Sequence, residues 1–212
     1  ALEFLRTRPQ DKPFCLTLAF FAPHAEDKNP LQYLPQPQSL KLYEDVTIPV
    51  PANATDASFR RLPEFIAHEK NEGRVRWRWR FDAPDKYQSM MKNYYRLVTE
   101  VDATCGRVLE ELKQQGLLDN TLVIFTSDNG GVMDDGYEAV GNFDHPCNGA
   151  LRGYKGSLFE GGHRVPFIAR WPGRIPAGAT SDETICLGDL LATSAAIVGA
   201  SLPPNAGEDS VN

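Results

Sequence analysis

The sequence lacks several features that mark common protein classes. Its 22 Lys and Arg residues are outnumbered by 28 Asp and Glu residues, which gives a formal net charge of −6. Proteins that bind nucleic acids generally carry a basic surplus, so this balance argues against such a partner. All apolar runs are well short of the roughly 18 residues that a membrane-spanning helix needs. We therefore expect no nucleic acid and no membrane as a partner.

Targeting and cysteine signals are also missing. Ala1 opens directly onto LEFLRTRPQD, without the basic start and apolar core of a signal peptide. Because such a start can be a processed end, it does not fix the compartment. The cysteines, which form no CxxC or Cys/His zinc spacing, are Cys15, Cys105, Cys147 and Cys186. We expect Cys15 and Cys105 to be small buried hydrophobic residues, because both lie among apolar neighbours.

The hydrophobic pattern predicts an α/β fold. Three apolar runs, 14–21, 121–126 and 165–171, predict strands covered on both faces, as in a parallel sheet. Apolar residues that recur every three or four positions predict a helix over 87–115, and a second helix is predicted over 187–198. This order of elements predicts a mostly parallel sheet flanked by helices.

Two further segments depart from this pattern. Residues 29–56 are rich in proline, which predicts an irregular excursion from a single domain that spans 1–212. In RVRWRWRF (74–81), arginines alternate strictly with apolar residues, which predicts a half-buried strand or an extended segment whose arginines are solvated or paired. The alternative is a platform of guanidinium groups that binds a polyanion.

The stretch TLVIFTSDNGG (121–131) places polar residues directly after a predicted strand. Ligands of open α/β sheets bind beyond the carboxyl ends of the strands. The side-chain oxygens of Asp128 and Asn129 are hard ligands that suit Ca²⁺ or Mg²⁺. Gly130 and Gly131 allow the backbone to turn sharply and approach a ligand. The alternative is an ordinary Asx turn, because this composition also favours one.

Two more residues carry groups that can act on an anion. His24 follows the first predicted strand, in FFAPH, and Lys155 lies in a glycine-flanked turn. Taken alone, each can be a structural or solvated residue. Together, two oxygens of metal-ligand type, an imidazole and an ammonium predict a site for a tetrahedral anion or its ester.

Four stretches resemble the sulfatases of the alkaline-phosphatase superfamily, in the arylsulfatase A-like branch. The resemblance implies that Asp128 and Asn129 are the second ligand pair of the active-site cation, Ca²⁺ with Mg²⁺ as the alternative. It implies that Lys155 holds the sulfate group and that His24 contacts the sulfate and the leaving oxygen, so both are candidate catalytic and substrate-binding residues. The stretches are PFCLTLAFFAPH (13–24), YYRLVTEVDATCGRVLEELKQQGLLDNTLVIFTSDNGG (94–131), LRGYKGSLFEGGHRVPFIARWPGRIPAG (151–178) and ICLGDLLATSAAIVGASLPPNAGEDSV (185–211).

Parts of the family pattern are missing. The family's nucleophile is a formylglycine made from a C/S-x-P-x-R motif, and no such motif occurs in the chain. The only Asp-Asp pair, Asp134-Asp135, follows the DNGG turn, whereas the family's first metal pair precedes it. We therefore expect a middle piece of a longer sulfatase, without the nucleophile region and the C-terminal subdomain and inactive alone. The resemblance favours an exported protein, periplasmic or extracellular.

Several alternatives stay open. The substrate implied is a small-molecule or glycan sulfate ester. The protein can instead be a phosphodiesterase or phosphatase of the same superfamily, or a non-catalytic module that binds sulfated glycans. Because the first strand of the family fold is expected to be missing, exposed strand edges also predict self-association.

Overall fold

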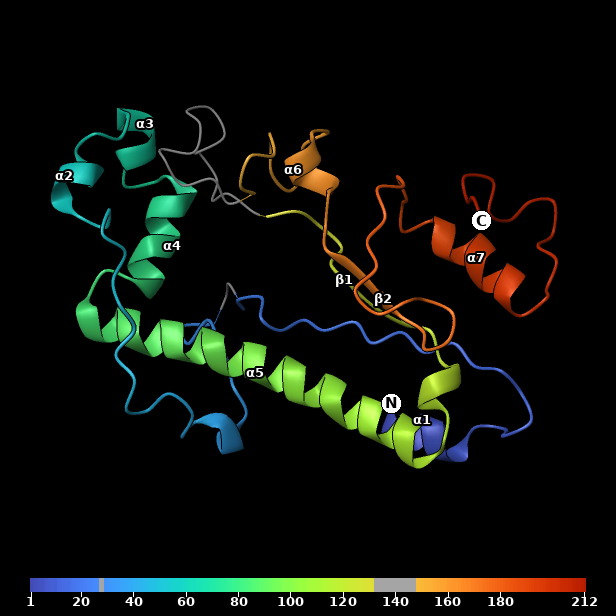
Figure 1. Ribbon diagram of the computed structural model, residues 1–212. Coiled ribbons are helices and arrows are strands. Elements are labelled where there is room, and N and C mark those ends of the chain that lie inside the picture. Colours follow the sequence, from blue (N-terminus) through green and yellow to red (C-terminus); the bar gives the residue numbers. More distant parts are fainter. Residues whose placement is uncertain (27–28, 132–147) are drawn as a thin grey trace. The chain divides into compact units, whose positions relative to one another are not determined.

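A computed structural model describes residues 1–26, 29–131 and 148–212 (Figure 1). The chain forms two compact units, one made of Ala1–Leu18 with Trp171–Asn212 and the other of Ala19–Arg170. His24, the 127–131 turn and Lys155 all belong to the second unit, whereas Asp134-Asp135 and Cys147 lie outside the described residues. Within these ranges, no helix combines the length and apolar character needed to cross a membrane.

The dominant element of the second unit is α5 (Pro84–Gln114), a helix of 31 residues. It ends where Gly116 adopts a left-handed φ of 69°. The N–H of Leu117 then donates to the carbonyl of Leu112 (2.8 Å), which closes the last turn. The helix predicted over 87–115 is therefore confirmed. Its buried apolar residues are Met90, Leu97 and Leu112.

The proline-rich segment 29–56 lies along α5 and contains only one short element, the 3₁₀ turn η1 (Pro37–Ser39). Side chains of α5 satisfy its backbone in place of a β-ladder. Gln88 accepts from the N–H of Ile48 (2.9 Å) and donates to its carbonyl (2.7 Å). Arg96 donates to the carbonyls of Leu40 (2.5 Å) and Leu42 (2.9 Å). The segment is thus irregular but attached at several points.

The arginine-rich segment is a helix, α4 (Glu72–Arg80), so the strand predicted over 74–81 is wrong. The Asn71 side chain caps its start by accepting from the N–H groups of Gly73 (3.0 Å) and Arg74 (3.4 Å). A helix keeps side chains three or four residues apart on one face, and an ion pair uses this spacing. The ion pairs of the arginines are Arg76 with Glu72, and Arg74 and Arg78 with Glu69. The expectation that the arginines are paired therefore holds for these three.

Two short strands form the sheet of the described residues, β1 (Val123–Thr126) and β2 (Phe167–Arg170). They pair antiparallel, with Val123 opposite Arg170 and Thr126 opposite Phe167. The parallel arrangement expected for these two runs is therefore wrong, because an apolar run does not report the direction of the neighbouring strand. The expected cover on both faces is wrong as well, because each strand alternates or mixes half-buried and exposed residues. Antiparallel pairing places the end of β1 beside the start of β2.

The first apolar run, 14–21, forms no strand in the described part of the chain. Within 14–18 half-buried and exposed residues alternate, and Cys15 is on the exposed side. The predicted burial of Cys15 is therefore wrong, while Cys105 on α5 is half-buried.

The first unit combines both chain ends. It contains α1 (Leu2–Thr7), with Leu5 fully buried, and α7 (Asp189–Ile197), which confirms the helix predicted over 187–198. The Asp189 carboxylate accepts from the N–H groups of Cys186 (2.7 Å) and Val211 (2.9 Å), so it fastens the C-terminal segment to the start of α7. The remaining elements, all in the second unit, are α2 (Asp56–Phe59), α3 (Glu64–Ala67), η2 (Leu118–Asn120) and α6 (Glu160–His163).

Candidate active site

The turn after β1 carries the acid–amide pair. The Asn129 amide nitrogen donates to Asp128 Oδ2 at 2.7 Å, so the two side chains lie against each other. The Ser127 hydroxyl donates to the carbonyl of Asn129 (3.1 Å) and tightens the turn. Asp128 is exposed to solvent and Asn129 is half-buried. The pair is therefore accessible to a ligand. An Asx turn would need a side-chain oxygen of Asp128 to accept the N–H of Gly130, and that N–H donates to the carbonyl of Gly162 instead.

Glycines bring this turn into direct contact with α6. The N–H of Gly130 donates to the carbonyl of Gly162 at 3.0 Å. A Cβ added to Gly130 would overlap the carbonyl of Gly161, and one added to Gly161 would overlap the carbonyl of Gly153. Only residues without a side chain allow the backbones to approach this closely. The 127–131 turn and the 153–162 segment therefore form one packed backbone cluster.

Lys155 lies in the same cluster. Its N–H donates to the carbonyl of Gly131 at 2.9 Å. Gly153 and Gly156, on either side, have φ values of 87° and 89°, which favour glycine. The side chain of Lys155 is exposed. The structure thus brings the lysine turn next to the turn that carries Asp128 and Asn129.

Asn148 links these two turns, and sequence reasoning missed it. Its Oδ1 accepts from the N–H of Gly131 (2.8 Å) and its Nδ2 donates to the carbonyl of Gly153 (2.8 Å). No motif or periodicity marks Asn148, because the groups that it binds in these two turns belong to the backbone, whose contacts the sequence does not show.

His24 is exposed and held locally. Its Nδ1 lies 2.7 Å from the carbonyl oxygen of Ala25, which can only accept, so Nδ1 carries a proton. Its ring also packs at 5.2 Å from that of Phe21. Among the described residues, no hydrogen bond or ion pair joins His24 to Asp128 or Lys155. Its place beside them stays a prediction.

His163 and Arg164, which follow the glycines of α6, have local partners. His163 Nε2 lies 3.1 Å from the carbonyl oxygen of Leu158, and Arg164 pairs with Glu160 at 3.1 Å. These contacts stabilise α6 and the segment before it. They give no reason to add either residue to the site.

The acid–amide pair fits part of a cation site. Asp128 and Asn129 offer side-chain oxygens of the kind that Ca²⁺ and Mg²⁺ prefer. No group of three or more His, Cys, Asp or Glu residues that could hold a metal occurs in the part of the chain that the structure describes. Because Ca²⁺ takes six to eight oxygen ligands, the pair fits as a partial ligand set that needs further donors.

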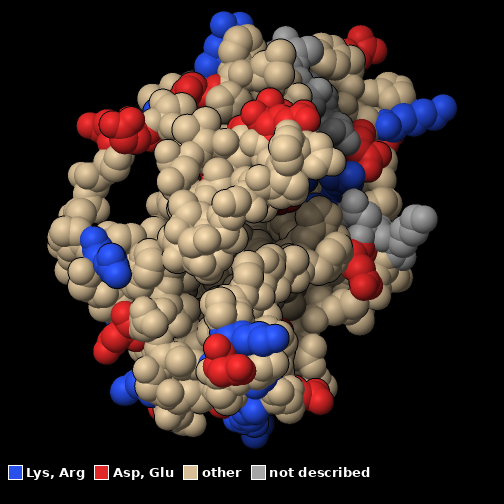
Figure 2. All heavy atoms as spheres, turned by 90° about the vertical axis from the view of Figure 1, so that its right-hand side faces the viewer, with Lys and Arg blue, Asp and Glu red and all other residues tan. Residues whose placement is uncertain are grey.

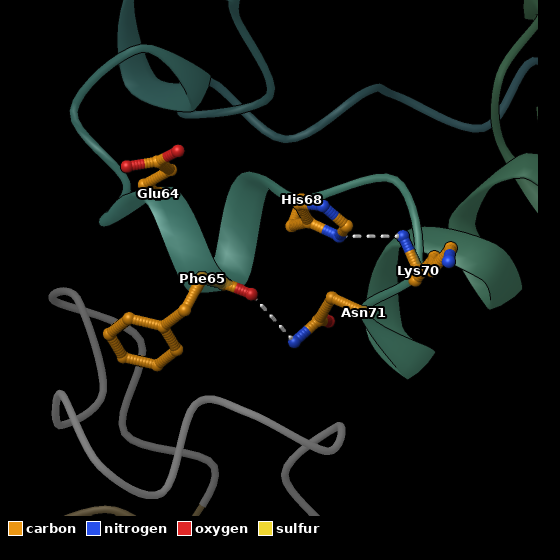
Figure 3. Close-up of a pocket in the computed structure, with 5 residues that line it drawn as sticks. All are labelled: Glu64, Phe65, His68, Lys70 and Asn71. Atoms are coloured by element: carbon orange, nitrogen blue, oxygen red, sulfur yellow. Dashed lines mark hydrogen bonds between the residues drawn. The ribbon is translucent and has the colours of Figure 1, made fainter.

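A separate hollow lies between α3 and α4, with a volume of about 590 Å³ (Figure 3). Its polar groups are largely engaged in local structure: His68 Nδ1 accepts from the N–H of Lys70 (3.2 Å), and Asn71 donates to the carbonyl of Phe65 (3.4 Å). None of the predicted site residues lines it. On the face shown in Figure 2, acidic and basic side chains are interspersed. Neither feature adds to the site.

Comparison with known proteins decides the family, because the profile described as "Sulfatase" matches residues 1–200. The chain belongs to the sulfatase family. It is 32% identical over 170 residues to human N-acetylgalactosamine-6-sulfatase, and the aligned region covers 76% of this chain and 32% of that enzyme. It is 44% identical over 104 residues to human arylsulfatase A, covering 49% of this chain and 19% of that enzyme. This sulfatase chain therefore spans about a third of the first relative and about a fifth of the second.

A solved structure supports the fold of the sulfatase chain. That structure shows a protein in complex with its substrate, D-glucosamine-2-N,6-O-disulfate. The aligned region covers 96% of this chain and 48% of the chain in that structure. The TM-score is 0.59 at 23% identity. Together with the family match, this likeness confirms the α/β sulfatase fold expected from the sequence, although the described strands pair antiparallel.

Proposed function

We propose that this chain supplies part of the active site of a sulfate-ester hydrolase. Asp128 and Asn129 contribute ligands for a divalent cation, and Lys155 contributes a cation for the sulfate group. The observation that supports this best is the 2.9 Å hydrogen bond from the Lys155 N–H to the carbonyl of Gly131. It holds the lysine turn beside the acid–amide turn, as a site for a negatively charged sulfate group requires. Membership in the sulfatase family supports the same function.

Each proposed residue has a distinct role. Asp128 and Asn129 would hold Ca²⁺, with Mg²⁺ as the alternative, and the ion would offset charge on the sulfuryl oxygens when bound. The Lys155 ammonium would bind the same oxygens, and charges fixed before the reaction stabilise its transition state. His24 in its imidazolium form would donate its Nε2 proton to the leaving oxygen while Nδ1 stays bonded to Ala25.

The nucleophile must come from elsewhere. In this family a formylglycine, made from a C/S-x-P-x-R motif, supplies the group that attacks sulfur, and this chain contains no such motif. We therefore propose that the 212-residue chain alone does not turn over sulfate esters. Release of sulfate from an aryl sulfate by the purified chain, above a Lys155→Ala control, would overturn this proposal.

The coding sequence upstream of Ala1 separates the proposed sulfatase from its alternatives. A C/S-x-P-x-R motif there supports the sulfatase. A lone Thr or Ser among metal ligands supports a phosphodiesterase or phosphatase instead. The absence of both patterns supports a glycan-binding module.

The glycan-binding alternative loses its main support in α4. Three arginines of the RVRWRWRF segment are paired with Glu69 or Glu72. Arg74 also lies over the rings of Phe59 (4.5 Å) and Trp77 (4.3 Å). Guanidinium groups engaged in this way are poor candidates for an anion platform. The proposed substrate stays a small-molecule or glycan sulfate ester.

Self-association is a further proposal. Phe125 and Ile168 face each other across β1 and β2, with 55% and 60% of their surfaces exposed. An exposed apolar pair, on a sheet that has two strands in the described part of the chain, favours pairing between copies. Size-exclusion chromatography tests this at micromolar concentration, with Phe125→Lys as the variant expected to shift the protein towards monomer. A wild-type protein that is already monomeric would contradict the proposal.

A further inference from the structure

One carboxamide holds both turns of the proposed site. Asn148 Oδ1 accepts from the N–H of Gly131, two residues after Asn129, and Nδ2 donates to the carbonyl of Gly153, two residues before Lys155. A longer contact of 3.5 Å runs from Nδ2 to the carbonyl of Gly131. Asn148 therefore contacts both turns through backbone groups.

The connection forms a closed set of hydrogen bonds. Gly131 donates its N–H to Asn148 and accepts the Lys155 N–H at its carbonyl, while Gly153 accepts from Asn148. A carboxamide offers a donor and an acceptor on one rigid planar group. The glycines allow the backbones to approach, but they bring no side chain that could fix how the turns face each other. Asn148, which is half-buried, supplies that restraint.

We propose that Asn148 is a positioning residue: it fixes the Lys155 turn relative to the Asp128–Asn129 turn, so that the ammonium and the cation ligands meet the same sulfate group. The part of this proposal that concerns sulfate binding rests on the proposed function. The hydrogen bonds that carry it are independent of that function.

The test uses substitutions that separate the two halves of the carboxamide. Asn148→Asp keeps the size and an acceptor for the Gly131 N–H, but places an oxygen against the carbonyl of Gly153. Asn148→Ala removes both bonds. Asn205→Asp makes the same chemical change at an exposed residue of the other unit and serves as the matched control.

Amide hydrogen exchange measured by NMR on the 212-residue chain tests the restraint without any ligand. In both Asn148 variants the Lys155 N–H should exchange about tenfold faster, the scale of one lost hydrogen bond. The amides in the middle of α5 should keep their rates, which shows that the fold persists. Unchanged exchange at Lys155 overturns the inference.

Titration with sodium sulfate in saturating CaCl₂ tests the purpose of the restraint. The dissociation constant should rise about tenfold in Asn148→Asp and stay unchanged in Asn205→Asp, as expected for one misplaced contact. Faster exchange with unchanged sulfate affinity would make Asn148 merely structural and overturn the positioning role. If the wild-type chain binds no sulfate, the proposed function fails, and the exchange rates alone decide whether Asn148 restrains the turns.

Discussion

The backbone N–H of Lys155 donates to the carbonyl of Gly131 at 2.9 Å, across 24 positions of sequence. Beside this bond, a Cβ added to Gly130 would overlap the carbonyl of Gly161, and one added to Gly161 would overlap that of Gly153. A lysine and an acid–amide pair that are distant in the chain therefore share one backbone cluster.

Gly130→Ala should destabilise the protein by about 1–3 kcal/mol, the usual cost of forcing an extra group into a packed region. The added methyl would overlap the carbonyl of Gly161, a backbone atom that cannot move alone. Urea unfolding followed by circular dichroism measures the change.

Gly106→Ala is the matched control for this change. Gly106 lies in α5 with nothing within 4 Å of its Cβ position. The control should stabilise the protein by up to about 1 kcal/mol, because alanine favours a helix over glycine. Equal effects of the two substitutions would contradict the packing argument.

Lys155→Ala should abolish sulfate binding with little change in stability. The side chain is exposed, so its loss should alter the free energy of unfolding by less than about 0.5 kcal/mol. Lys155→Arg should retain part of the affinity, because it keeps the charge but changes the geometry. Calorimetric titration with sulfate measures both variants, and full affinity in Lys155→Ala would remove this residue from the site.

The sequence predicted the long helix better than the arrangement of the strands. The apolar stripe of α5 is a local pattern, and its C-terminal glycine is local too. The run VPFIARW predicted a strand, but the direction of β2 depends on which strand it meets. The alternation in RVRWRWRF predicted a strand, but the segment is a helix. The Asn71 cap and the ion pair of Arg76 with Glu72, which has helical spacing, stabilise that helix. The described partners of Asn148 in the two turns are backbone groups, so no residue pattern predicts its role.

Asp128→Asn should weaken Ca²⁺ binding by at least about tenfold, because a neutral amide replaces a charged hard ligand. Asp102→Asn, at an exposed position of α5, provides a matched loss of one charge outside the turn. Isothermal titration with CaCl₂ compares the two. If both variants lose the same affinity, the effect is one of net charge, and the metal role of Asp128 is contradicted.

The Asp189 carboxylate should make the attachment of the C-terminal segment sensitive to acid. Hydrogen bonds from the N–H groups of Cys186 and Val211 hold the pKa of Asp189 below its ordinary value. A lowered pKa in the folded state means that this stabilisation is present above the unfolded pKa of about 4 and is lost as the pH falls through the folded value. Hydrogen exchange of the Val211 amide should therefore show protection at pH 6 that decreases in acid.

Asp189→Asn should weaken that protection at pH 6 and remove its dependence on acid. Asp182→Asn, at an exposed position of the same unit, should leave the profile unchanged. A Val211 amide whose protection follows the same acid profile in the Asp189 variant would contradict this assignment.

Because of how residues 29–56 attach to α5, the segment and the helix should differ in how well they tolerate mutation. The helix contributes side chains to these hydrogen bonds, whereas the segment contributes mostly main-chain carbonyls and N–H groups. Many replacements within the segment would leave those groups in place. Deleting a single residue from the helix would rotate its later donors by about 100° around the axis, which would carry Arg96 away from both carbonyls that it now binds.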